Sequence, residues 1–137
     1  MEDCIFCKII NNEASSWKVY EDDLVIAIFD IYPASVGHTL VIPKEHYIDI
    51  YDIPEDLAGH ITKVCKRVAL NLKKTLGVEA VNLIQGSGKS AQQDVFHFHM
   101  HVIPREENDD FKLYYQPRHD IKQMFDELLE KIKKERV

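Results

Sequence analysis

The spacing of apolar and polar positions along the chain predicts five short strands. Alternation with a period of two is typical of a strand that lies between two environments. It is clearest from Val95 to Pro104, where histidines occupy odd positions and large apolar side chains the even ones. Glu21-Asp22-Asp23 supplies hairpin-turn chemistry between the first two strands. The other predicted strands span residues 17–20, 24–29, 38–43 and 80–84.

Apolar residues at helical spacing predict a short helix over residues 4–12 and a long one in mid-chain. The long helix begins at Pro54, whose missing N–H costs nothing in a first turn, and ends at Gly77. Its apolar stripe could serve a partner, but packing against a sheet is the favoured interpretation. The stripe consists of Leu57, Ile61, Val64, Val68, Leu72 and Leu76.

A third helix is predicted from Asp120, whose carboxylate can cap it while Gln123 completes a capping box. Its apolar face comprises Ile121, Met124, Phe125, Leu128, Leu129 and Ile132. The order of elements is helix, three strands, helix, two strands, helix. With short early connections, this order predicts one α+β domain over residues 1–137 with an antiparallel sheet.

Composition excludes several classes of partner. A formal charge of −6 gives no basic footprint for nucleic acid, so an anionic ligand would be held by local dipoles and a few side chains. The longest apolar run, residues 24–29, is too short to cross a bilayer, so no membrane association is expected. Because no signal-peptide core follows the acidic start, we expect a cytoplasmic location.

The histidine-bearing strand is the main candidate for chemistry. His97, His99 and His101 fall on one face, and each imidazole can act as nucleophile, acid, base or ligand. Next-but-one residues on a strand lie about 7 Å apart and the outer pair about 13 Å, so one metal shared by all three is not expected. We therefore expect the three histidines to have different roles.

Cys4 and Cys7 form a C-x-x-C pair, and an odd total of three cysteines argues against a disulfide framework. The pair has the spacing of zinc ligands, and His46 and His97 could complete a four-ligand set that clips the first helix to the sheet. A redox dithiol is the rival interpretation, although no strand precedes the pair as in a thioredoxin-like unit. Cys65 lies in the long helix and is expected to be a small buried hydrophobe.

The stretch Gly86-Ser87-Gly88-Lys89-Ser90 is not a P-loop. That motif needs a glycine where Leu83 stands and a helix after the serine, whereas a strand is predicted here. A weaker expectation remains, that N–H groups of this turn hold a phosphate beside the histidines.

Several segments together resemble the histidine triad (HIT) family. His97-Phe98-His99-Met100-His101-Val102-Ile103 is similar to the family signature, and Cys4–Ile10, Phe29–Ile31 and Gly37–Lys44 resemble its opening and middle. The likeness covers a core of residues 4–104, whereas the extension over residues 105–137, with its helix, varies within the family. The resemblance implies a five-stranded antiparallel sheet with a long central helix, usually in a homodimer whose sheets join.

The resemblance also implies roles for individual residues. His99 would be the nucleophile that forms a covalent nucleotidyl intermediate, His101 would bind phosphate, and His38 would support them, although a satisfied core histidine looks the same from sequence. Asp30 would bind the ribose, and Gln93 would contact the nucleotide. Many bacterial-type members carry the two cysteines and two histidines as a structural zinc site. The purine would lie among Ile5, Phe6, Ile9 and Phe29, for which core packing is an equally good interpretation.

Two residues depart from the family pattern. Gln92 replaces a glycine whose backbone approaches phosphate, and Asp94 adds a negative charge nearby, so substrate preference and turnover are in doubt. The expected function is a purine nucleotide-binding hydrolase that attacks the α-phosphorus of AMP- or GMP-like derivatives, phosphoramidates in particular. The alternatives are a dinucleoside polyphosphate hydrolase, a nucleotide-binding regulatory protein with little turnover, and a zinc-carrying interaction module.

Overall fold

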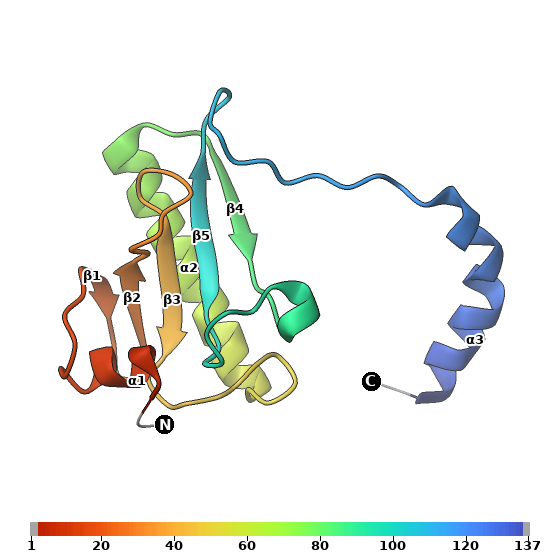
Figure 1. Ribbon diagram of the computed structural model, residues 1–137, viewed down its shortest axis with the longest axis horizontal. Coiled ribbons are helices and arrows are strands. Elements are labelled where there is room, and N and C mark those ends of the chain that lie inside the picture. The colour runs from red at the N-terminus through yellow and green to blue at the C-terminus, as the bar shows by residue number, and fades with distance from the viewer. Residues whose placement is uncertain (1–2, 136–137) are drawn as a thin grey trace.

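A computed structural model describes residues 3–135. Its centre is an antiparallel five-stranded sheet in the order β1-β2-β3-β5-β4 (Figure 1). The fold is therefore the α+β architecture that the order of elements predicts, with β1 and β4 at the two edges. The strands are β1 Lys18–Glu21, β2 Val25–Phe29, β3 Thr39–Pro43, β4 Ala80–Ile84 and β5 Met100–Arg105.

Within residues 3–135, three α-helices and two 3-10 turns accompany the sheet. The helices are α1 Ile5–Ile10, α2 Glu55–Leu76 and α3 Phe125–Glu135, and the turns are η1 Lys89–Ala91 and η2 His119–Met124. Pro54 stands at the N-cap of α2, and Gly77 ends that helix in the left-handed region, with φ 71°. Between residues 3 and 135, none of the helices has both the length and the apolarity to cross a membrane.

The two faces of the sheet carry separate cores because side chains alternate along β2. Val25 and Ala27 point to the face that α2 covers, where the predicted stripe supplies Ile61, Val64, Val68 and Leu72. Ile26 and Ile28, which alternate with these two residues along β2, point to the other face. That second core consists of Phe6, Ile9, Ile26, Ile28, Leu40 and Ile42, so α1 packs there.

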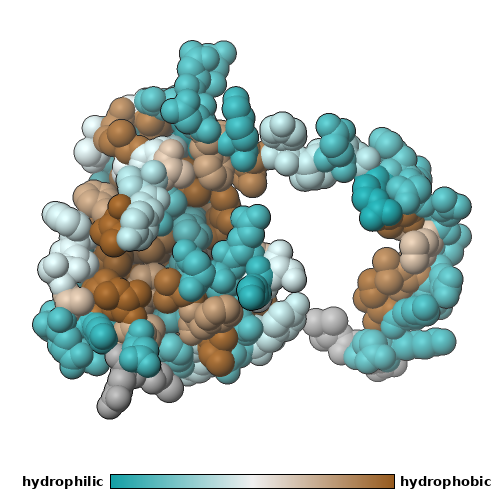
Figure 2. All heavy atoms as spheres, viewed as in Figure 1, coloured by the Kyte–Doolittle hydropathy of each residue, from teal (hydrophilic) through white to brown (hydrophobic). Residues whose placement is uncertain are grey.

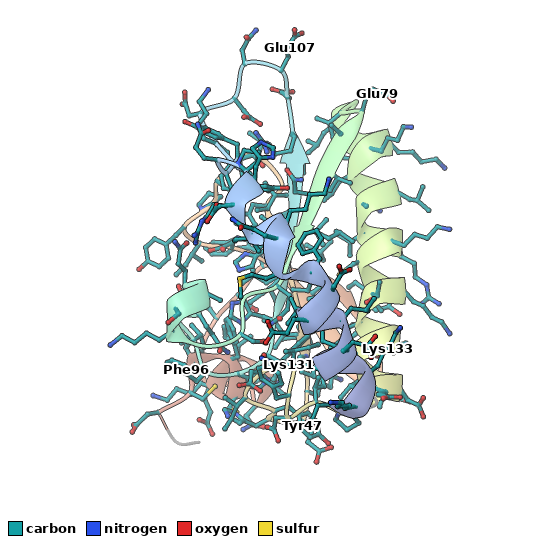
Figure 3. All side chains as sticks on the ribbon, turned by 90° about the vertical axis from the view of Figure 1, so that its right-hand side faces the viewer. Tyr47, Glu79, Phe96, Glu107, Lys131 and Lys133 are labelled. Carbon is teal, nitrogen blue, oxygen red and sulfur yellow. The ribbon has the colours of Figure 1, made fainter. Side chains whose placement is uncertain are left out.

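The histidine strand is shorter than the alternation predicts. β5 begins at Met100 rather than Val95, and β3 pairs with it only from Met100 to Val102. The reason is a long-range contact, since the N–H of Phe98 donates to the carbonyl of Tyr47, 2.6 Å away, in the loop after β3. Figure 3 shows Tyr47 and Phe96 at the same end of the body, opposite Glu79 and Glu107.

The predicted start of the last helix is wrong. Asp120 does not cap a helix; it lies in η2 and pairs with Arg118 at 3.0 Å, and α3 begins at Phe125. The segment from residue 106 to 118 carries η2 and α3 away from the body as an arm (Figure 1). Figure 2 shows the apolar side of α3 turned toward open space beside the body. Within the described part of the chain, no residue of α3 is buried.

One carboxylate ties the β1–β2 turn to α2. Asp22 accepts hydrogen bonds from the N–H groups of Leu24 and Val25 at 2.8 and 2.9 Å and from the hydroxyl of Tyr20 at 2.8 Å. It also lies 2.7 Å from Nε2 of His60 on α2. Burial raises the pKa of Asp22, but these hydrogen bonds outweigh it and hold the pKa well below its usual range.

We expect Asp22→Asn to destabilise the protein by about 2 kcal/mol at neutral pH, because one amide cannot replace a carboxylate that accepts from several donors. A lowered pKa in the folded state means that the contribution is present above the unfolded pKa of about 4 and is lost as pH falls below it. Urea unfolding at pH 7 and at pH 3 checks both statements. Asp23→Asn, with the same charge change at an exposed neighbour, should change little; equal losses in both variants would contradict the role of Asp22.

Candidate functional site

The histidine row lies against the core formed by α1. The ring of Phe6 contacts His97 and His99 edge-on, with centroids 5.8 and 5.1 Å apart. His97 and His99 are almost fully buried, and His101 is partly exposed. The face predicted by alternation is thus preserved although only the last histidine lies in β5. The backbone around each ring determines which nitrogen carries a proton.

His97 faces the cysteines. Its Nε2–H donates to the carbonyl of Pro43 at 2.8 Å, which leaves the lone pair of Nδ1 directed elsewhere. That lone pair points to the thiols, with Sγ of Cys4 at 3.3 Å and Sγ of Cys7 at 3.6 Å. Metal-binding histidines are typically oriented by such a bond from their second nitrogen.

Four side chains that are far apart in sequence could hold one metal ion. Sγ of Cys7 lies 3.3 Å from Nδ1 of His46, and the ligand atoms of Cys4, Cys7, His46 and His97 all lie within 4.8 Å of one another. Zinc bonds of about 2.3 Å to sulfur and 2.0 Å to nitrogen place tetrahedral ligand atoms roughly 3.3 to 3.8 Å apart. The donor set and its spacing therefore fit zinc.

The chemistry of the thiols also favours a metal over a redox dithiol. Burial, followed by the neighbouring Cys4, raises the pKa of Cys7 to about 11. A thiol with such a pKa is a poor nucleophile at neutral pH, whereas zinc binds thiols as thiolates. Sγ of Cys4 also accepts the N–H of Cys7 at 3.4 Å, so the first ligand caps α1.

His99 has the opposite tautomer from His97. Its Nδ1–H donates to the carbonyl of His97 at 2.8 Å, so Nε2 carries the lone pair. A carboxylate oxygen of Asp94 lies 3.9 Å from that Nε2. The side chain of Asp94 is 84% exposed, so the pair marks the point where the buried row reaches solvent.

A chain of hydrogen bonds fixes the proton of His101. The N–H of Ala34 donates to Nδ1 of His38 at 2.9 Å, so His38 carries its proton on Nε2. That Nε2–H donates to Nδ1 of His101 at 2.9 Å, so His101 carries its proton on Nε2. Burial lowers the pKa of His38 against the effect of Asp30, and burial, with His99 and His38, lowers that of His101 to about 4. Both rings are therefore neutral at pH 7.

Asp30 lies beside the hydrogen-bonded pair of His38 and His101. Its carboxylate is 3.4 Å from Nε2 of His38 and 3.9 Å from Nδ1 of His101, and it accepts the N–H of Tyr32 at 2.8 Å. The side chain is only 14% exposed. These contacts place Asp30 at the site, and its expected bond to a ribose stays a prediction.

The four apolar residues expected around a purine divide into two pairs. Phe6 and Ile9 are buried in the second core, whereas Ile5 and Phe29 are 44% and 41% exposed. Core packing accounts for the first pair. Only the second pair presents enough surface to stack on a base.

Gln93 braces the loop that follows β4. Its Oε1 accepts the N–H of Gly88 at 2.8 Å, and its Nε2 donates to the carbonyls of Ile48 and Val95 at 2.7 and 3.2 Å. Every polar atom of the amide is thus engaged within the protein. A direct contact with the nucleotide stays a prediction, but the observed contacts are those of a residue that shapes the loop.

The loop explains why a glycine would suit position 92. Gln92 has φ 66°, a left-handed conformation that costs a side-chain-bearing residue energy. Gly86 cannot be replaced in the same way, since a Cβ there would lie 2.6 Å from the carbonyl of Ala91. After Ser90 the chain completes a 3-10 turn and enters no α-helix, in agreement with the absence of a P-loop motif.

Fewer loop N–H groups face a ligand than expected. Those of Gly88, Ala91, Gln92 and Gln93 all donate to atoms of the loop itself. A phosphate beside His99 therefore depends on side-chain donors more than on a cradle of backbone amides.

Sequence reasoning missed a hollow of about 420 Å³ that Asp94 lines. The hollow combines carboxylates with apolar side chains. Among the sequence patterns, only the C-x-x-C pair pointed to one of its lining residues, Cys4. The lining residues are Asp3, Cys4, Ile5, His46, Asp94, Val95 and Phe96.

Comparison with known proteins decides the family. The HIT domain model matches residues 11–108. The chain belongs to the HIT family. An uncharacterized HIT-like protein of Borreliella burgdorferi is 50% identical over 113 residues, 81% of either chain. Adenylylsulfatase HINT3 of Arabidopsis thaliana is 41% identical over 107 residues, 78% of this chain and 54% of that protein.

Solved HIT structures share the whole fold. A HIT family protein from Bacillus anthracis has a TM-score of 0.91 at 37% identity and matches 99% of both chains. A HIT family member from Bacillus subtilis has a TM-score of 0.91 at 35% identity over 98% of both. A zinc-bound histidine triad protein from Mycobacterium smegmatis has a TM-score of 0.78 at 32% identity, over 98% of this chain and 99% of that one.

These matches confirm the family resemblance and the predicted α+β fold. HIT proteins bind nucleotides and are generally nucleotide hydrolases or transferases. The zinc-bound relative and the Cys4/Cys7/His46/His97 cluster point to zinc in this HIT protein as well.

We expect the purified protein to contain one zinc ion per chain and Cys7→Ser to lose it. The melting temperature should fall by several degrees, because the ion would connect α1 to the sheet through residues far apart in sequence. Elemental analysis and thermal unfolding measure the two effects. Cys65→Ala, which removes a buried cysteine from α2, should also lower the melting temperature but keep the zinc. The site would be ruled out if wild-type protein contained no zinc and its melting temperature did not change when zinc was added or chelated.

Proposed function

We propose that this HIT protein hydrolyses phosphoramidates of purine nucleoside monophosphates through a covalent histidyl-nucleotide. The observation that carries the proposal is the pair of opposed tautomers on the row. His99 presents a lone pair on Nε2, and His101 presents a proton on Nε2. A nucleophile beside a hydrogen-bond donor suits attack on a phosphoryl group.

In the first step, Nε2 of His99 attacks the α-phosphorus and the P–N bond to the leaving amine breaks. The amine departs with the bonding electron pair and takes a proton from water. The attacking ring becomes positively charged, and its Nδ1–H bond to the carbonyl of His97 strengthens because the donor is now cationic. The Asp94 carboxylate, 3.9 Å from Nε2, stabilises the same charge.

In the second step, water attacks phosphorus and the bond to Nε2 breaks. The electron pair returns to His99, and the nucleoside monophosphate and one proton are released. The Nε2–H of His101 donates to a phosphoryl oxygen in both steps, held in that tautomer by the relay through His38. The proposed purine would lie against Ile5 and Phe29, and the ribose beside Asp30.

Zinc has a structural role in this proposal. When bound, the ion would connect the two cysteines, His46 and the ring of His97, while the carbonyl of His97 orients His99. His97 would therefore connect the zinc site to the proposed nucleophile. Its ring would bind the ion, and its backbone carbonyl orients His99. In keeping with the family resemblance, we propose a homodimer as the working form.

Asp94 favours phosphoramidates over dinucleoside polyphosphates, the second candidate. A polyphosphate leaving group would carry several negative charges past Asp94 and toward a hollow that Asp3 also lines. An amine leaving group carries none and is attracted once protonated. Turnover of AMP-linked phosphoramidate and of diadenosine polyphosphate, measured side by side, decides between them; turnover of neither would favour a nucleotide-binding regulatory protein.

His99→Ala should lower phosphoramidate turnover by several orders of magnitude and leave AMP binding within a few-fold of wild type, because it removes the atom that forms the covalent bond. Steady-state kinetics and calorimetric AMP titration measure the two effects. His119→Ala, at an exposed histidine of η2, is the control and should keep full activity. Retention of more than roughly a tenth of wild-type turnover by His99→Ala would contradict the nucleophile assignment.

Asp94→Ser should tighten AMP binding several-fold at low salt, because it removes a negative charge near the phosphate, and the gain should shrink as screening increases. The same change should raise turnover of diadenosine polyphosphate relative to phosphoramidate. AMP titrations at two ionic strengths and the two assays test this. Asp23→Ser removes an equal charge in the β1–β2 turn and should have no effect. Unchanged affinity and unchanged selectivity in Asp94→Ser would show that the carboxylate does not act on the ligand.

A further inference from the structure

The hollow that Asp94 lines adjoins the proposed nucleotide site. Its volume of about 420 Å³ lies within the usual range of ligand pockets, roughly 300 to 1,000 Å³. Two of its lining residues also belong to the proposed site. Ile5 presents surface for the purine, and the carboxylate of Asp94 lies 3.9 Å from Nε2 of His99. A substituent on the phosphorus that His99 attacks therefore has the hollow within reach.

In the proposed hydrolysis, the leaving amine is the one part of the substrate that has no assigned place. The purine would lie against Ile5 and Phe29, and the ribose beside Asp30. The phosphoryl group would lie between His99 and His101. Because the hollow begins at a residue next to the nucleophile, it offers the amine a place beside the phosphorus.

The charge of the hollow is negative. Asp3 and Asp94 are both exposed, and among residues 3–135 no lysine or arginine lines the hollow. The carboxylate of Asp94 is also held in place, because its Oδ1 accepts the N–H of Val95 at 2.9 Å. An ammonium group in the hollow would be attracted to two carboxylates, whereas a third carboxylate would be repelled.

The rest of the wall includes apolar side chains that suit an alkyl chain. Ile5 and Phe96 are 44% and 50% exposed, and Val95 is half-buried. Phe96, labelled in Figure 3, also provides an aromatic ring, which attracts a cation placed over its face. A short alkyl chain that ends in an ammonium group matches both the apolar surface and the charge.

We propose that the hollow binds the leaving group and that the preferred substrates are phosphoramidates of aliphatic diamines. One nitrogen of the diamine would be bonded to phosphorus, and the other, as an ammonium group, would pair with Asp3 and Asp94. This inference rests on the proposed hydrolysis and names its leaving group. The P–N bond breaks, the released nitrogen keeps the electron pair and takes a proton from water, and the ammonium group at the other end is unchanged.

Three AMP phosphoramidates that differ only at the far end of the amine test the proposal. Those of diaminobutane, pentylamine and aminopentanoate end in an ammonium, a methyl and a carboxylate group. At low salt, kcat/KM for the diaminobutane derivative should exceed that for the pentylamine derivative about fivefold, and the aminopentanoate derivative should be poorer by a similar factor. Both differences should shrink as salt rises.

Asp3→Asn isolates the hollow, because Asp3 has no place in the proposed catalysis. It should lower the ratio of kcat/KM between the diaminobutane and pentylamine derivatives at least twofold and leave turnover of the pentylamine derivative unchanged. Asp94→Asn should lower the same ratio, in which any effect on the chemical step cancels. Asp23→Asn, in the β1–β2 turn, is the control and should keep the ratio. Equal kcat/KM for the three substrates, or a ratio that neither Asp3→Asn nor Asp94→Asn changes, would overturn the proposal.

Binding separates this inference from the proposed hydrolysis. His99→Ala should bind the three phosphoramidates without cleaving them, so calorimetric titration measures the same preference in the absence of turnover. If wild type cleaves none of the three, the proposed hydrolysis fails, yet tighter binding of the diaminobutane derivative would still support the hollow as its site. Equal affinities for the three compounds would overturn the inference whether or not wild type cleaves them.

Discussion

The rest of the site depends on how His97 is held. Its Nε2–H is fixed by Pro43 at the end of β3, its Nδ1 faces Cys4 and Cys7, and its carbonyl fixes the proton of His99. One residue thus connects the sheet, the candidate metal cluster and the proposed nucleophile. A small rotation of this ring would alter the thiol distances, and a shift of its peptide would alter the tautomer of His99. The histidines to which we assign different roles are therefore mechanically coupled.

Local patterns predicted most of the body. The stripe on α2 and the alternation along β2 correspond to the two cores because helices and strands bury one face at a time, and Gly77 ends α2 because it adopts a left-handed conformation. The start of β5 could not be predicted from its own residues. It is set by the bond from Phe98 to Tyr47, which lies about fifty residues away and belongs to the tertiary fold.

The residues of the candidate site could be named from the sequence, whereas the geometry between them could not. The C-x-x-C spacing and the family resemblance indicated a zinc set, and the three alternating histidines indicated divided roles. Which nitrogen carries each proton depends on Ala34, Pro43 and the carbonyl of His97, and no side-chain pattern encodes those backbone positions. The apolar residues show the same limit: Ile5 and Phe6 are adjacent and similar in polarity, yet one is exposed and the other is core. At Asp120, a good capping residue lies in a 3-10 turn instead, where its carboxylate pairs with Arg118.

The neutral relay from Ala34 through His38 to His101 also affects how the proposed reaction would end. A nucleoside monophosphate is more highly charged as a product than as part of a phosphoramidate ester. A site that binds phosphate with fixed cations would hold that product tightly and be inhibited by it. In the proposed complex, the groups nearest the phosphorus would be a neutral donor, a regenerated neutral imidazole and a carboxylate, so the attraction for the ligand would not grow once the bond is cut. The proposed product would then leave without a conformational change to expel it.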